Sequence, residues 1–294
     1  MVRYGITITT EVNGMDHRTS STGHMTFDIV DGLAIVIDCD DIDGDVIVPE
    51  WIPSDDGDVH VTAVGEDAFE DCTDITSVTL PESITSIGRC AFRGCSGLES
   101  VNIPSNVVSI GEWAFYGCRG LITVDLPDGI TAIEDGTFAG CNGLRSIDIP
   151  DNVTSIGEDA FNGCSGIVSV RLPDSVTSIG NTAFSRCSGL EYVNIPKNVT
   201  SIGMGAFNSC PALHTMEVDG DNGQYSFRDG MLLSKDGTVL YKCLIHETEE
   251  FTIPSGIESI EDYAFLDCRM LRSVRIPESV KHVGENAFHG CPLI

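Results

Sequence analysis

The chain has 294 residues, of which 41% are hydrophobic and 7% aromatic, enough apolar material for a substantial core and too much for a disordered segment. Its 45 Asp and Glu outnumber 16 Lys and Arg, and the formal net charge of −29 repels phosphate backbones and anionic bilayers. We therefore expect no nucleic-acid binding and interpret the charge as a means of keeping an elongated body soluble.

The N-terminal stretch MVRYGITITTEVNG lacks the continuous apolar block of a secretion signal, so no signal peptide is visible in this chain. No segment reaches the roughly 18 uninterrupted apolar residues of a membrane helix, and we expect no membrane insertion. Two alternatives stay open: the chain acts in the cytoplasm, or it is a segment whose leader was removed.

An acidic segment from Cys39 to Glu50, CDDIDGDVIVPE, imitates the spacing of a calcium-binding EF-hand loop through Asp41, Asp43 and Gly44. However, Cys39 stands at the first ligand position, and strand-like sequence follows where the second helix should begin. We interpret the segment as an acidic turn, with calcium binding as a remote alternative and no metal site expected.

Phenylalanine recurs at a fixed interval of 23 residues along most of the chain. The positions are Phe69, Phe92, Phe115, Phe138, Phe161, Phe184 and Phe207, followed by Phe265 and Phe288. The interval from Phe207 to Phe265 is 58 residues, so one unit is 12 residues longer than the others. Such a strict period is typical of a solenoid, in which each unit is one coil.

One unit, residues 92–114, contains two short extended pieces. Its apolar and turn positions are, in order, Leu98, Val101, Ile103, Pro104, Val107, Ile110 and Gly111. The first three predict a short strand that ends at the proline, which has no N–H to donate. The next two predict a second extended piece, and the glycine permits a turn. A coil this small buries its apolar side only against neighbouring coils, with equivalent strands about 4.8 Å apart.

Cysteine forms a second column, three residues after each phenylalanine. Its members are Cys72, Cys95, Cys118, Cys141, Cys164, Cys187, Cys210, Cys268 and Cys291. No C-x-x-C pair or regular histidine accompanies them, and equivalent thiols offer no unique disulfide pairing. We expect reduced, buried thiols that donate to local carbonyls. Cys39, Cys90 and Cys243 lie outside this column.

The lengthened unit, residues 219–253, contains YSFRDGMLLSKDGTVLYKC at 225–243. Its Asp-Gly pairs at 229–230 and 236–237 predict a β-hairpin excursion near 219–250. Residue 294 falls early in a new coil, so the last repeat is incomplete, and an uncapped coil exposes strand edges. We expect either further polypeptide or packing of this end, with a homodimer through the incomplete C-terminal coil as one alternative.

The segment LESVNIPSNV at 98–107 fits the leucine-rich pattern L-x-x-L-x-L-x-x-N through Leu98, Val101, Ile103 and Asn106. With IP, SIG, AF and GC in fixed phase, the whole unit resembles the Treponema pallidum class of leucine-rich repeats, the BspA-like proteins, over residues 46–294. The resemblance implies a right-handed leucine-rich repeat solenoid of short β-strands, turns and short 3-10 segments.

The same resemblance implies that residues 1–45 form a strand-rich N-terminal lead-in or cap, ahead of a solenoid domain at 46–294. Val48-Pro49 and Val64-Gly65 stand where IP and IG occur in regular units. The greater spacing between them predicts a loop of nine extra residues around Ser54 to Asp58.

Leucine-rich repeats usually bind partners on the concave face of their strands, so the outward residues of the first strand are the candidate binding site. They are Ser100, Asn102, Thr123, Asp125, Ser146, Asp148, Ser169, Arg171, Tyr192, Asn194, Thr215 and Glu217. Tyr192 is the only large aromatic side chain among them, a residue type favoured as an interface anchor. Alternatively, the small hydroxyl side chains only suit close, hydrated β packing.

Members of the family are mostly cell-surface or secreted proteins linked to adhesion, without common catalytic residues. The resemblance therefore implies a non-catalytic module that recognises a protein ligand, such as a host or neighbouring-cell surface protein, without a cofactor. A structural spacer in a larger surface protein is the alternative. An enzyme is a remote one, because the seven histidines share no column and no nucleophile stands at fixed spacing from them.

Overall fold

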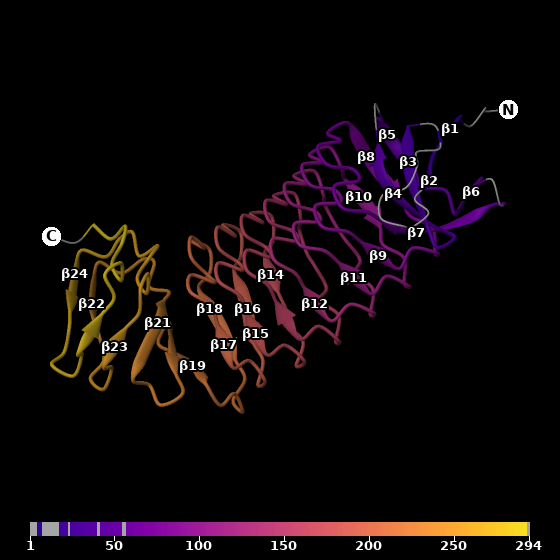
Figure 1. Cartoon of the computed structure of the whole chain (residues 1–294). Helices are drawn as coiled ribbons and strands as arrows, with labels where there is room; N and C mark the ends of the chain where they lie inside the picture. Colours follow the sequence, from indigo (N-terminus) through magenta and orange to yellow (C-terminus); the bar gives the residue numbers. More distant parts are fainter. Residues whose placement is uncertain (1–4, 8–17, 23, 40–41, 55–56, 293–294) are drawn as a thin grey trace.

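The computed structural model describes residues 5–7, 18–22, 24–39, 42–54 and 57–292. Figure 1 shows these residues as coils stacked side by side, from the indigo lead-in to the yellow C-terminal coils. Coils repeat at the predicted spacing, and the described residues contain strands and turns but no helix. The predicted solenoid is therefore confirmed. Asp41, which completes the calcium-loop pattern, lies outside the described residues.

The lead-in is a mainly antiparallel sheet that continues into the first coils. Its strands are β1 (Gly5–Thr7), β2 (Arg18–Thr22), β3 (Met25–Val30), β4 (Leu33–Cys39), β6 (Trp51–Ile52), β7 (Val59–Val64), β9 (Ser86–Ile87) and β11 (Ser109–Ile110). Strands β1 to β4 pair antiparallel, and β4 pairs parallel with β7, where coil stacking begins. The predicted extra loop is the connection between β6 and β7, closed by mutual backbone hydrogen bonds between Ser54 and Gly57; residues 55 and 56 lie outside the described residues.

The first strand of each coil forms parallel ladders along the stack. Before the lengthened unit, two groups of these strands are defined: β5 (Gly44–Ile47), β8 (Ile75–Thr79) and β10 (Ser100–Asn102), then β14 (Ser169–Val170), β16 (Tyr192–Ile195) and β18 (Thr215–Val218). Register follows the period, so that Val101 lies opposite Val78 and Tyr192 opposite Ser169. Between the groups, residues 121–126 and 144–149 keep the alternation of buried and exposed side chains without forming strands.

The second extended piece forms another set of parallel ladders, usually from a Ser-Ile pair. Besides β9 and β11, its strands are β12 (Ala132–Ile133), β13 (Ser155–Ile156), β15 (Ser178–Ile179), β17 (Ser201–Ile202), β23 (Ser259–Ile260) and β25 (His282–Val283). Because only two residues pair in each coil, backbone hydrogen bonds in the corners contribute much of the contact between coils.

The corners consist of successive turns, and the expected 3-10 segments are not found in the described part of the chain. The physical reason is that two positions in most corners adopt a left-handed backbone, such as Trp113 (φ 58°) and Gly117 (φ 73°). A 3-10 helix needs negative φ throughout, so these positions interrupt it. The second position explains the glycine of the GC motif, although Arg186 and Ser209 also adopt this conformation there.

The phenylalanine and cysteine columns line the buried interior, as predicted. Consecutive rings from Phe69 to Phe207 stack with centroids 5.0 to 5.6 Å apart and interplanar angles of 14° or less. Each column cysteine from Cys95 to Cys210 donates its S–H to the carbonyl of the phenylalanine 26 residues earlier, at 2.9–3.1 Å. The expectation of buried thiols bonded to local carbonyls is therefore confirmed for the stretch from Cys95 to Cys210.

Gly136 shows how closely neighbouring corners approach. Its φ is 61°, and a Cβ at this position would run into the ring of Trp113 in the preceding coil. We expect Gly136→Ala to lower the free energy of unfolding by about 1–3 kcal/mol, because it adds backbone strain and displaces the ring. In Gly220→Ala the new Cβ meets nothing within 4 Å, so its effect should stay within about 0.5 kcal/mol. Urea denaturation measures both, and equal effects would contradict this interpretation.

The lengthened unit is the predicted hairpin excursion, extended to three antiparallel strands. They are β19 (Tyr225–Arg228), β20 (Met231–Ser234) and β21 (Val239–Cys243). Positive φ angles at Asp229, Gly230 and Gly237 confirm the predicted turns. Strand β21 then pairs parallel with β23 and returns the chain to the stack, where β22 (Glu250–Thr252) pairs with β24 (Ser273–Arg275).

Both ladders are interrupted at the lengthened unit. The backbone N–H of Cys243 donates to the carbonyl of Ala264 at 2.7 Å, as the N–H of Phe184 does to that of Ala206. Cys243 therefore takes the phenylalanine position in this coil, and Cys268 donates its S–H to the Cys243 carbonyl. We call this place, residues 208–210, 242–243 and 266–268, the seam. The buried side chains form one cluster before it and a second after it.

Candidate functional site

The outward side chains of the first strand form one continuous surface, which we call the strand face. All twelve predicted site residues lie on it: ten are exposed, and Tyr192 and Asn194 are half-buried. The buried residues between them, such as Val101, Val124 and Val193, anchor the backbone in the core. Alternation therefore predicted correctly which side chains point outward.

Three predicted residues from consecutive coils form a cluster in the C-terminal half of this face. The guanidinium carbon of Arg171 lies 5.8 Å from the centre of the Tyr192 ring, within cation–π range. The Tyr192 hydroxyl donates a hydrogen bond to the Glu217 carboxylate. Partial burial and the neighbouring Glu217 raise the pKa of Tyr192, so the phenol keeps its proton at neutral pH. The result is an ordered aromatic ring held between a cation and an anion.

Two predicted residues are held by the backbone of the preceding coil. Asn102 accepts a hydrogen bond from the N–H of Leu80 at 2.6 Å and donates to its carbonyl at 3.1 Å. Asn194 bonds the N–H and carbonyl of Leu172 in the same way, at 2.6 and 2.8 Å. These amides join neighbouring coils, so we assign them a structural role within the face.

Sequence reasoning missed a third column on this face, one residue before the first outward position. It contains Glu99, Ile122, Arg145, Val168, Glu191 and His214, all exposed. Ile122 and Val168 are 47% and 48% exposed, large values for aliphatic side chains, and they flank Arg145 along the stack. The sequence did contain the signal for this column. In each unit two residues lie between the buried leucine position and the buried valine position, such as Leu98 and Val101, so both of them point outward.

The N-terminal end of the face is different in character. Asp45 accepts hydrogen bonds from Ser77 at 2.6 Å and Thr76 at 3.1 Å. These bonds, that from Ser77 first, lower the pKa of the exposed Asp45 carboxyl. Next to it Ile47 is 70% exposed. Acidic groups and one aliphatic side chain thus mark this end, whereas Arg145 and Arg171 lie further along the face.

The side chains of the strand face are hydroxyls, amides, carboxylates, arginines and isolated apolar groups, without a nucleophile paired to a base among the described residues. Across the described residues, no three His, Cys, Asp or Glu side chains converge as a metal ion would require. The described ranges also hold no helix long and apolar enough to cross a membrane.

Comparison with known proteins identifies the repeat. The sequence matches the profile of the BspA type leucine rich repeat region over residues 62–165, 131–233 and 239–294. No curated protein matches the chain. A leucine rich cell surface protein from Faecalibacterium prausnitzii A2-165 is 33% identical, with a TM-score of 0.81 over 93% of this chain and 74% of that one.

Two more distant crystal structures share the fold. A leucine-rich repeat protein from Eubacterium ventriosum is 24% identical, with a TM-score of 0.55 over 92% of this chain and 62% of its own. The pneumococcal vaccine antigen PcpA is 20% identical, with a TM-score of 0.59 over 98% of this chain and 80% of its own. The repeat profile, the stacked coils and the 33% identical relative agree, and the chain belongs to the BspA-type leucine-rich repeat family.

Proposed function

We propose that the protein is a non-catalytic cell-surface or secreted recognition module that binds a protein partner through its strand face. The observation that carries the proposal is the Arg171–Tyr192–Glu217 cluster together with Ile122, Arg145 and Val168. Aromatic and arginine side chains are the residue types that contribute most to protein interfaces. The cell-surface relative supports the location.

A protein ligand fits this surface better than a sugar or an inorganic surface. Among its described residues, the strand face has one outward tyrosine and no outward phenylalanine or tryptophan, whereas its aliphatic, cationic and anionic groups are interspersed. Such a mixture suits a partner with its own mixed polar and apolar surface. The stacked coils hold these side chains on rigid backbone, so little conformational entropy is lost on binding.

The chain offers a matched pair of variants to test the strand face. Arg93 lies over the Tyr116 ring at 5.8 Å, the same distance as Arg171 over Tyr192, but in a corner of the coils. We expect Arg171→Ala/Tyr192→Ala to weaken binding at least about tenfold, because it removes two anchor side chains. Arg93→Ala/Tyr116→Ala should leave binding unchanged.

Binding is measured on immobilised extracellular-matrix proteins and on whole cells, with circular dichroism as the check that both variants stay folded. Equal losses of binding in the two double variants, or undiminished binding by the strand-face variant, would show that the strand face does not bind the partner. Loss only in the strand-face variant supports the proposal.

A further inference from the structure

The seam contains a buried lysine that neither the repeat pattern nor the strand face explains. Lys242 is the fourth residue of β21, and its side chain is 7% exposed. It lies between Asn208, in the corner of the last regular coil, and Asp267, in the corner of the next one. A buried cation is costly unless specific partners hold it. This lysine therefore requires an explanation from its surroundings.

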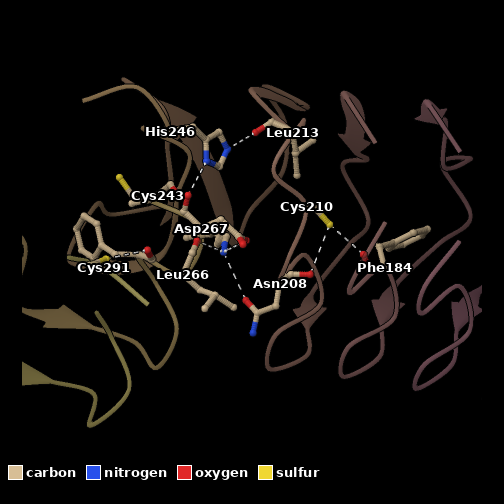
Figure 2. A network of polar contacts seen from close by, with 12 residues as sticks. Phe184, Asn208, Cys210, Leu213, Cys243, His246, Leu266, Asp267 and Cys291 are labelled. Carbon is tan, nitrogen blue, oxygen red and sulfur yellow. Dashed lines mark hydrogen bonds and ion pairs between the residues drawn. The ribbon is translucent and has the colours of Figure 1, made fainter. Parts of the chain in front are cut away.

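Three oxygen atoms surround the Lys242 nitrogen, one each from Asn208, Leu266 and Asp267, the three residues that Figure 2 labels at this place. Nζ donates to the carbonyl of Leu266 at 2.9 Å and to Oδ1 of Asn208 at 3.5 Å, and Oδ2 of Asp267 lies 3.6 Å away. This Oδ2 atom is buried and accepts no hydrogen bond, and the Asp267 side chain is 4% exposed. An amine, a carboxamide and a carboxyl thus share one water-poor site.

Burial moves the Lys242 amine towards its neutral form, because it lowers the pKa of this lysine against the opposing effect of Asp267. Transfer of one ammonium proton to the carboxylate would convert the buried ion pair into two neutral groups. A desolvated neutral lysine is a nucleophile, and the adjacent amide presents its carbonyl to it.

The site also has a way out for a small product. Asn208 and Lys242 line a cleft with a cavity volume of about 210 Å³, whose wall includes Tyr241 and Glu261. Asn208 is half-buried, so its amide lies between the closed lysine site and this cleft. Ammonia released from the amide would reach solvent through the cleft.

We propose that Lys242 and Asn208 join in an intramolecular isopeptide bond across the seam. Asp267 takes a proton from the Lys242 ammonium, and the neutral Nζ attacks Cγ of Asn208 to form a tetrahedral adduct. Asp267 then delivers this proton to the amide nitrogen, the Cγ–Nδ2 bond breaks and ammonia leaves. The Asp267 carboxylate takes the second proton from Nζ, so the products are a neutral amide, ammonia and a protonated Asp267. The new Nζ–Cγ amide releases one ammonia and needs no oxidant, metal or cofactor.

The bond would strengthen the solenoid where its stacking is interrupted. Coils of a solenoid are held only by their neighbours, and at the seam Cys243 replaces a phenylalanine of the ladder. His246 also bridges this place, with Nε2 2.8 Å from the Leu213 carbonyl and Nδ1 3.4 Å from that of Asp267. A covalent link from Asn208 to Lys242 would keep the C-terminal coils attached to the rest of the stack.

The test is the mass of the full-length folded chain, followed until it is constant, and of its tryptic peptides. We expect a mass one ammonia below that of the sequence, no tryptic cleavage after Lys242, and a branched peptide joining it to Asn208. Full mass with normal cleavage would overturn the proposal. A mass one water lower, with the branch at Asp267, would overturn the assignment to Asn208.

Variants separate this chemistry from a merely structural role. Asn208→Ala should abolish the branched peptide, whereas Asn162→Ala, at the same position two coils earlier and bonded to Asp159, should retain it. Asp267→Asn keeps the side-chain shape and should slow the loss of ammonia at least about tenfold, because it removes the proton carrier. An unchanged rate in this variant would overturn the role of Asp267, and the wild-type peptide map is decisive if a variant fails to fold.

Discussion

Replacing Phe138 with alanine is expected to lower the free energy of unfolding by about 3–5 kcal/mol, the cost of a large buried cavity. Phe138 is fully buried at the centre of the ladder, with its ring 5.5 Å from that of Phe115 and 5.6 Å from that of Phe161. The truncation removes two ring stacks and much of the apolar contact of one coil with both neighbours.

Urea denaturation followed by circular dichroism measures this effect. The control is Tyr116→Ala, which removes an aromatic ring of similar size that is 41% exposed in the corner one coil earlier. It should cost less than about 1 kcal/mol, because its ring leaves no closed cavity. A loss below about 1 kcal/mol in Phe138→Ala would mean that the ladder does not hold the coils together.

Raising the pH above 9 is expected to unfold the protein. Burial raises the pKa of Cys164 and Cys210 from the ordinary 9.0 to about 12 and also raises the pKa of Cys141 and Cys187. The folded chain thus keeps protons that the unfolded chain releases above pH 9. Below pH 9 the protonated thiols make their full contribution to the free energy of unfolding. As the pH rises from 9 towards 12, this contribution falls by about 1.4 kcal/mol per pH unit for each thiol.

Four such thiols are sufficient to exhaust a typical stability of about 5–15 kcal/mol within one to three pH units. The measurement is urea denaturation at a series of pH values between 7 and 11. Cys164→Ala should lose stability less steeply than the wild type, by the contribution of one thiol. A stability that stays constant to pH 11 would show that the column thiols already ionise in the folded state.

The regular coils could be predicted from the sequence because their period places equivalent residues in contact. A phenylalanine or cysteine that recurs every 23 residues meets its own kind in the next coil, so periodicity alone identified the interior. The seam could not be predicted this way. There the register is lost for one unit, and no pattern indicated that Cys243 takes the phenylalanine position or that Lys242 is buried beside it.

The corners and the strand face show two further limits. A glycine in the sequence indicates a possible left-handed backbone. Trp113 and Arg186 also adopt this backbone, because stacking forces every coil to follow the same path. Their residue types gave no indication of it. Alternation placed Asn102 and Asn194 on the outward face correctly. It could not show that their amides turn along the stack to bond Leu80 and Leu172, because that contact is between coils.

The stacked coils share a dry interior with the cysteine column inside it, and pulse alkylation of the native protein tests this most directly. We expect a haloacetamide at neutral pH to leave the ten buried cysteines unmodified, whereas the same cysteines react in denaturant. Rapid labelling of Cys118, Cys141 or Cys164 without denaturant would contradict the account.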